Sequence, residues 1–473
     1  MSSINLINGG LDVQGIVDNL ITVASAPITR LQAQTKTYQD KITAYQTFNA
    51  KLLAFKTSVE DLLFKGEDVL LNIPSAFADR FSKSLFALRK ATSSDDAVVT
   101  ATAGKGVVTG NFTVTVSKLA KFNSFASNNF ASDTTTNTAT GTLVIQKGTD
   151  AAVTITVDAT NNTLQGIKNA INNANAGVTA SVLNDGSSTP YRLTITSNDS
   201  GSAGALTITN NLNQGAGSAV TLGETTPADD AAFQINGVNV TSSSNRVTNA
   251  VEGVTFDLKA ESGTASITVE RDIDSIVAGL KDFVAKYNDV VSNISSQSRY
   301  DATTKTSGIL AGDFTVRQTQ ADLSSALSQS INFTGSSLSL LSQIGIKLGN
   351  DGTLSIDETK LRDKLSSNFR ETAQLMLADA TDAGGNTISM VPMLQGRLKS
   401  LTDSYDGPVF HATDAIQQNI RRINDQIDEM NARLDVQREL LIAQFSKADE
   451  ALRQLSVLQT SLISQLNSLS GLA

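Results

Sequence analysis

The sequence predicts a multidomain α+β protein in which both chain ends form helical, coiled-coil domains and two β-rich domains are inserted in the middle. Apolar residues recur at helical spacing near both ends. Residues from about 91 to 268 instead alternate apolar side chains with Thr and Ser. The C-terminal segment holds a seven-residue apolar repeat. A chain of 473 residues is long enough for several such domains.

The first segment, to about residue 89, is predicted to be helical. Its apolar residues share one face before Pro27, which interrupts the pattern: Leu11, Ile16, Val17, Leu20 and Ile21. A second set repeats every seven residues after the proline: Tyr38, Tyr45, Leu52 and Val59. Both sets form a stripe that a helix buries against a partner.

The middle segment reads as short strands, because β-branched residues alternate with polar ones. The clearest runs are 112–116, 153–157, 193–196, 206–209 and 267–269. Asn236-Gly237 lies between two such runs and favours a tight hairpin turn. An amphipathic stretch at 164–171 predicts one short helix among the strands.

The last segment, from about residue 272, returns to helical spacing, with one hairpin predicted from 344–348 through Gly352 to 353–356. From Asp414 a seam repeats every seven residues: Ile420, Ile427, Leu434, Leu441, Ala448, Leu455, Leu462 and Leu469. Companion residues on this face include Phe445, Leu452 and Leu466. Four glutamines on or beside the seam weaken a simple two-stranded zipper: Gln437, Gln444, Gln459 and Gln465. The helix needs a partner, either the N-terminal stripe or further copies of the chain.

Composition argues against an enzyme. There is no Cys and only one His, so thiolate nucleophiles, zinc fingers and multi-histidine sites are excluded. His411 has no second ligand or nucleophile near it in sequence and is expected to cap or pack a loop before the final helix. A net charge of −9 disfavours nucleic acid and anionic membranes as partners. We expect no catalytic residue, metal or cofactor, no cleaved signal peptide and no membrane insertion.

An ordered set of motifs resembles one family, the flagellar hook-associated protein 2 or filament-capping (FliD) family. The set begins with Gly10-Leu11-Asp12-Val13 and Ala26-Pro27. It continues through the middle of the chain with the segments 110–120, 233–238 and 250–255. It ends with the segments 283–288, 309–313, 352–357, 438–446 and 459–461. The resemblance covers nearly the whole chain.

The resemblance implies a structural, ring-forming cap at the distal end of the bacterial flagellar filament. Such caps are exported unfolded through the flagellar type III channel, act outside the cell, and help flagellin fold and insert without being lost. Implied partners are other copies of the chain, flagellin, hook-associated junction proteins and an export chaperone at the C-terminal helix. Four domains are expected. They are a terminal leg of 1–37 with 431–473, a helical bundle of 38–90 with 273–430, a β domain of 91–130 with 231–272, and an inserted β domain of 131–230.

The stripes at the two ends are the expected assembly interface: Leu11, Ile16, Val17, Leu20, Leu441, Phe445, Leu452, Leu455, Leu462, Leu466 and Leu469. In particular, the N-terminal residues are expected to pack with Leu455, Leu462, Leu466 and Leu469. Two alternatives stay open. One is a flagellin or hook–filament junction protein, which shares helical ends and β-rich outer domains. The other is a surface adhesin that binds host glycans through residues 91–272.

Overall fold

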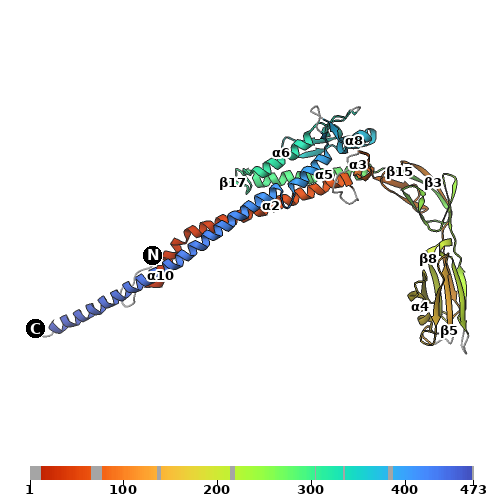
Figure 1. Cartoon of the computed structure of the whole chain (residues 1–473), viewed down its shortest axis with the longest axis horizontal. Coiled ribbons are helices and arrows are strands. Elements are labelled where there is room, and N and C mark those ends of the chain that lie inside the picture. Colours follow the sequence, from red (N-terminus) through yellow and green to blue (C-terminus); the bar gives the residue numbers. More distant parts are fainter. Residues whose placement is uncertain are drawn as a thin grey trace. The chain divides into compact units, whose positions relative to one another are not determined.

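The computed structural model confirms the α+β class. It describes residues 12–64, 77–135, 140–213, 219–303, 305–333, 336–381 and 387–470. The chain divides into two compact units, one built from Met1–Phe77 with Val277–Ala473 and the other from Ala78–Ile276. Helices dominate the first unit and antiparallel strands the second (Figure 1).

Two helices form the N-terminal part of the helical unit. Helix α1 (Val13–Ala24) begins at Asp12, whose Oδ1 accepts a hydrogen bond from the Gly15 N–H at 2.9 Å. The break with α2 (Ala26–Phe64) falls at Ser25. Pro27 thus lies in the first turn of α2, where its missing N–H leaves no hydrogen bond unmade. The predicted interruption near Pro27 is therefore confirmed, although helix does not continue unbroken to residue 89.

The rest of the helical unit, over its described residues, consists of the elements from α5 onward. The helices are α5 (Ile273–Ser298), α6 (Phe314–Ser328), η3 (Leu341–Ile344), α7 (Glu358–Ser367), α8 (Phe369–Leu377), α9 (Val391–Leu401) and α10 (Pro408–Ser470). Three two-stranded hairpins lie between them: β16 (Tyr300–Asp301) with β17 (Thr306–Ser307), β18 (Ile346–Leu348) with β19 (Leu354–Ile356), and β20 (Ala380–Thr381) with β21 (Thr387–Ile388). The β18–β19 hairpin turns through Gly352 at φ +82°, as the sequence predicts.

The core of the helical unit is organised by the apolar stripe of α2. Tyr45, Leu52 and Val59, three members of the seven-residue repeat, are buried. Between them the Phe55 ring lies 5.4 Å from the ring of Phe283 on α5. Edge-on and tilted ring pairs of this kind add to the stabilisation from apolar burial.

A polar contact fixes α2 against the start of α6. The Tyr45 hydroxyl donates to Asp313 Oδ2 at 2.6 Å, and Asp313 Oδ1 accepts from the Val316 N–H as the N-cap of α6. Burial, together with the Asp313 carboxylate, raises the pKa of Tyr45 above its usual value. The phenol therefore stays a neutral donor, and one carboxylate serves both a helix end and a neighbouring helix.

The β unit begins with α3 (Phe77–Lys83) and η1 (Leu85–Ala87), and its strands surround two separate apolar clusters. The first cluster includes Val114, Phe233, Phe256 and Ile267. A five-stranded sheet in the order β1-β15-β3-β11-β12 and a three-stranded sheet β13-β14-β2 enclose it. Their bounds are β1 (Arg89–Ser93), β2 (Val99–Ala103), β3 (Gly110–Lys118), β11 (Ala231–Ile235), β12 (Val238–Ser242), β13 (Arg246–Val251), β14 (Val254–Leu258) and β15 (Gly263–Arg271).

The predicted Asn-Gly turn joins β11 to β12. Asn236 and Gly237 both take positive φ, +51° and +82°, the backbone that a tight hairpin turn needs. The Asn236 side chain also accepts a hydrogen bond from the Thr113 N–H at 2.8 Å, which ties the turn to β3.

The second cluster includes Leu143, Ile167, Leu193 and Ile195. Its sheets have the orders β10-β4-β8-β7 and β6-β5-β9, and the predicted short helix α4 packs on β7. The bounds are β4 (Phe122–Ser127), β5 (Thr140–Lys147), β6 (Val153–Val157), α4 (Leu164–Asn173), β7 (Val178–Asn184), β8 (Tyr191–Ser200), η2 (Ser202–Gly204), β9 (Leu206–Asn213) and β10 (Leu222–Thr226).

The position of β4 corrects one predicted boundary. The sequence analysis assigned residues up to 130 to the first β domain. However, β4 pairs with β8 and β10, and Phe130 is buried in the second cluster. The chain therefore crosses to the second sheet before Phe122. The four-domain division as a whole stays a prediction.

Replacing Phe283 with alanine tests the aromatic core. The side chain is fully buried, so Phe283→Ala should lower the free energy of unfolding of the helical unit by about 3–5 kcal/mol. Denaturant unfolding followed by far-UV circular dichroism measures this loss. The matched control is Phe314→Ala, because Phe314 is 71% exposed and its loss should cost about 0.5 kcal/mol or less. Equal effects of the two substitutions would contradict the packing of Phe283 in the core.

Candidate assembly surface

The two ends of the chain meet along the long helix α10. Helix α10 packs along both α1 and α2, and Figure 1 shows the blue C-terminal helix beside the red N-terminal ones. Ala24 and Ile28 line one shallow pocket with Met430 and Leu434 of α10. The N-terminal helices, one of the two candidate partners from the sequence, thus pack on this part of α10, and we call this pairing of the chain ends the helical hairpin.

The hairpin is antiparallel, and its register is defined by three levels. Residues from 27–34 line one pocket with residues from 426–433, and Ala24 and Ile28 line another with Met430 and Leu434. At the third level, Asp18 accepts an ion-paired hydrogen bond from Arg438. Residues nearer the N-terminus on α1 and α2 therefore lie beside residues nearer the C-terminus on α10.

This register separates the predicted interface residues into two groups. Val17 is fully buried, and Ile16, Leu441 and Phe445 are partly buried where α1 and α10 run together. Leu20 is 45% exposed. Four residues farther along α10 are largely exposed: Leu452, Leu455, Leu462 and Leu466. Leu11 lies outside the described residues, and so does the side chain of Leu469.

The expected packing of the N-terminal stripe on Leu455, Leu462 and Leu466 is therefore wrong within one chain. Their side chains are 62%, 57% and 62% exposed. The reason is the position of α1 along the axis of α10. Val17 lies near the level of Arg438 and Leu441, so α1 is already paired several helical turns before Leu455 is reached.

The exposed apolar surface of α10 is continuous along its last turns. Besides the predicted leucines, it includes Leu458 and Ile463, which are 59% and 50% exposed. Sequence reasoning on the seven-residue seam did not single out these two, although they are visible as extra apolar residues beside it. Apolar patches of this size on a soluble helix mark interaction sites.

Further apolar residues are exposed on the same stretches of the two helices as the Asp18–Arg438 pair. They are Leu20 and Val23 on α1 and Val436 and Leu440 on α10. The ion pair itself is roughly half-exposed on both sides, so it contributes at most about 1 kcal/mol. Its main consequence is to set the register of the two helices rather than to hold them together.

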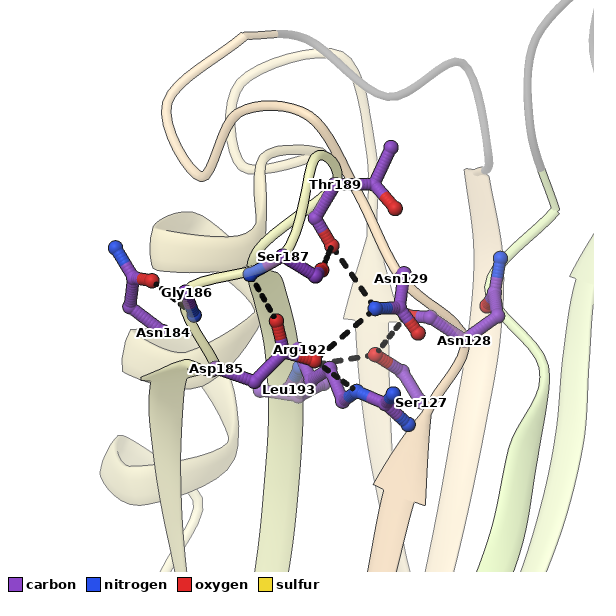
Figure 2. Close-up of polar contacts among 10 residues, drawn as sticks. All are labelled: Ser127, Asn128, Asn129, Asn184, Asp185, Gly186, Ser187, Thr189, Arg192 and Leu193. Atoms are coloured by element: carbon purple, nitrogen blue, oxygen red, sulfur yellow. Dashed lines mark hydrogen bonds and ion pairs between the residues drawn. The ribbon is translucent and has the colours of Figure 1, made fainter.

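A polar cluster at one end of the second β domain is a second candidate surface that sequence reasoning missed. Figure 2 shows it between the end of β4 and the turn from β7 to β8. Asp185 Oδ1 accepts from the Ser187 N–H at 3.0 Å, and its Oδ2 accepts from Arg192 Nε at 3.0 Å and from Asn129 Nδ2 at 3.2 Å. The signal was present as Asn184-Asp-Gly-Ser, a turn sequence followed closely by an arginine.

These contacts bind the turn to β4. Asn129 Nδ2 also donates to the Thr189 carbonyl at 2.9 Å, and the Leu193 N–H donates to Ser127 Oγ at 2.9 Å. Hydrogen bonds from Ser187 and the ion pair with Arg192 lower the pKa of Asp185 from 3.8 to about 2. Every polar group in this description has its partner inside the cluster, so the geometry accounts for a stable turn without a ligand.

The sole histidine forms no buried site. Sequence reasoning expected His411 to cap or pack a loop before the final helix, but it lies in the first turn of α10 because the helix begins at Pro408, a residue favoured at that position. The His411 Nε2 atom lies 3.0 Å from Asp406 Oδ1, and the side chain is 61% exposed. Within the described residues, no three His, Asp or Glu side chains are grouped so that they could hold a metal ion.

The long helices of this unit are too polar to span a membrane. Over the described ranges of the chain, no helix is both long enough and apolar enough to cross a bilayer.

The depressed pKa of Asp185 predicts an acid-sensitive turn. Because the folded-state pKa lies below the unfolded value, the charged carboxylate stabilises the turn above about pH 4, and this contribution is lost as the pH falls toward about 2. Urea unfolding of the β unit between pH 5 and pH 2 measures the loss. We expect Asp185→Asn to be less stable at pH 5 and to show a shallower decline. Asp96→Asn, an exposed control in the same unit, should follow the unmodified chain. An Asp185→Asn decline as steep as that of the unmodified chain would contradict the prediction.

Comparison with known proteins finds one family along the chain. The N-terminal profile of flagellar hook-associated protein 2 matches residues 9–123, and the C-terminal profile matches residues 228–456. Flagellar hook-associated protein 2 of Escherichia coli O157:H7 is 30% identical over 96% of this chain and 94% of its own length. The A-type flagellar hook-associated protein 2 of Pseudomonas aeruginosa is 30% identical over 100% of this chain and 98% of its own.

Solved structures lead to the same family. The crystal structure of the D1-D2-D3 domains of the flagellar cap protein FliD from Escherichia coli has a TM-score of 0.61 and 29% identity, covering 79% of this chain and 99% of that one. These relatives are named as flagellar cap or hook-associated proteins and not as enzymes. The profile matches at both ends of the chain and the relatives aligned over nearly all of it show that this chain belongs to the flagellar hook-associated protein 2 family, the FliD family of flagellar cap proteins.

Proposed function

We propose that this protein forms a ring-shaped homo-oligomer at the distal end of the bacterial flagellar filament. There it promotes the folding and insertion of exported flagellin and prevents its loss. One observation carries the proposal beyond family membership. The end of α10 exposes a continuous apolar surface that the described part of the chain does not cover.

Free energy explains why such a helix requires partners. Burying one large apolar side chain stabilises an assembly by about 1.5–3 kcal/mol before ordering costs. Leu455, Leu462 and Leu466 gain little of this in the isolated chain, because more than half of each side chain remains exposed. Assembly at the filament tip would bury these leucine side chains. This role needs no catalytic group.

Other partners follow from the same surface and location. Before export, a chaperone binding the C-terminal helix would cover the apolar residues that are exposed on α10. At the tip, flagellin is the neighbour of the ring, and the hook-associated junction proteins, which lie at the filament base, are further proposed partners. Export through the type III channel places the protein outside the cell.

The location is tested by immunogold electron microscopy of intact cells, with antibody against the β unit. Label confined to filament tips is the expected result. Label along the shaft would instead indicate flagellin, and label at the filament base would indicate a junction protein. Label scattered over the cell body would favour an adhesin, which a soluble glycan-binding assay on the full chain would then examine. Each of the last three results contradicts the proposed function.

Replacing Leu455 with lysine tests the apolar surface. The side chain is 62% exposed, so Leu455→Lys should change the stability of the folded chain by about 0.5 kcal/mol or less. In the assembled ring, however, a charge would be buried without a partner, so capped filaments should be lost. Filament length in a strain that carries the variant is the measurement.

The matched control is Ser464→Lys, which adds the same charge to the opposite face of the same helix. It should leave filament growth intact. Normal filaments with Leu455→Lys, or equal loss with both variants, would contradict a role for this surface in capping.

A further inference from the structure

Methionine is the side chain of this protein that oxidants attack most readily. The chain has no cysteine and no tryptophan, but it has five methionines. A thioether that gains one oxygen atom becomes methionine sulfoxide, so a flexible apolar group becomes a polar one. Because no thiol competes for the oxidant, the accessibility of each methionine sulfur decides which residue reacts first. Met1 lies outside the described residues, and the other four lie within them.

Three of the four described methionines are protected. Met376 and Met390 are both 0% exposed, so an oxidant in water does not reach their sulfurs. Met393 is partly buried, and its Sδ accepts a hydrogen bond from Arg397 Nη2 at 3.9 Å. That bond engages a lone pair of the sulfur, which is the electron pair that an oxidant attacks.

Met430 on α10 is the methionine that solvent can reach. It lines a pocket of about 490 Å³ between α2 and α10, together with Arg30, Gln34, Glu429 and Arg433. These four polar residues are exposed, and Arg433 pairs with Glu429 at 2.6 Å beside the pocket. The pocket is therefore open to water, and small solutes enter it and meet the Met430 side chain.

The other side of Met430 faces the apolar contact between the chain ends. There it lines a second pocket, of about 150 Å³, with Ala24 and Ile28 of the N-terminal helices and Leu434 of its own helix. Ile28 is 6% exposed, and α1 ends and α2 begins within this same stretch, at Ser25. Met430 therefore lies where both N-terminal helices pack on α10.

Oxidation makes the apolar side of this position unfavourable. A sulfoxide oxygen is a hydrogen-bond acceptor, and burying such a group without a donor costs free energy. The aliphatic side chains of Ala24, Ile28 and Leu434 offer no donor, whereas Arg30 and Gln34 in the larger pocket do. The oxidised side chain is therefore more stable on the polar side, away from Ile28.

We propose that Met430 is a redox-sensitive site whose oxidation by a peroxide loosens the helical hairpin. One oxygen atom is transferred to Sδ: an S–O bond forms, the O–O bond of hydrogen peroxide breaks, the sulfur loses two electrons and water is released. The side chain then leaves its apolar contact, and α1 is held less firmly on α10. A methionine sulfoxide reductase reverses the step with electrons from thiols. The proposal concerns the hairpin of a single chain, so it stands or fails independently of the ring proposed above.

Peptide mapping by mass spectrometry tests the site in the full-length protein during treatment with hydrogen peroxide. Met430 should be oxidised at least about tenfold faster than Met376 and Met390, and faster than Met393, because susceptibility follows exposure. In the chain unfolded by guanidinium, all four should react at similar rates. Folded-state oxidation of Met393 as fast as that of Met430, or of all four at one rate, would overturn the proposal.

Hydrogen exchange measured by mass spectrometry tests the loosening. After oxidation, amide exchange in α1 should rise at least about tenfold, because local opening governs exchange, while exchange in α5 stays unchanged. Treatment with a methionine sulfoxide reductase should restore the original rate. Unchanged exchange in α1 of the oxidised protein would overturn the switch.

The matched control is Met430→Leu, which keeps the volume of the side chain but cannot be oxidised. The same peroxide treatment should leave amide exchange in α1 of this variant unchanged. An equal rise in both proteins would overturn the proposal, since another residue would then be responsible for the loosening.

Discussion

The axial register between α10 and the two N-terminal helices is the constraint on which the rest of the helical unit depends. Apolar contacts at Ile28 and Met430 and the ion pair of Asp18 with Arg438 align the two arms of the hairpin. Once that alignment is fixed, the point at which α10 leaves its partner is fixed as well. A shift by one heptad would keep apolar residues facing one another but would expose a different set of leucines. The register therefore decides which side chains remain for other molecules.

The sequence could predict the stripe but not this alignment. A seven-residue repeat specifies which face of a helix is apolar, and the same repeat satisfies several axial offsets almost equally well. That is why Leu455 and Leu462 were expected to contact the N-terminal stripe of the same chain. The offset comes from a few side chains far apart in sequence, such as Asp18 and Arg438, and one sequence alone does not reveal such a pairing.

In the β unit the local elements were easier to predict than their assignment to domains. Strand alternation identified β6 and the Asn236-Gly237 turn, because each depends on neighbouring residues only. The segment around β4 was assigned to the wrong β domain, since strand pairing over long sequence separations decides where a strand belongs. The Asp185 cluster was missed for a similar reason, because its partners Asn129 and Arg192 come from separate parts of the chain.

The 63-residue length of α10 has a mechanical consequence. At 1.5 Å per residue the helix is about 95 Å long and behaves as a stiff rod, since bending it sharply requires breaking backbone hydrogen bonds. Its first turns are anchored in a packed core through Ile423 and Val409. A sideways force on the free end is therefore transmitted along the rod to that anchor with the advantage of a long lever arm. Small displacements in that core therefore become large displacements at the far end of α10. A displacement of the far end is transmitted to the core in the same way.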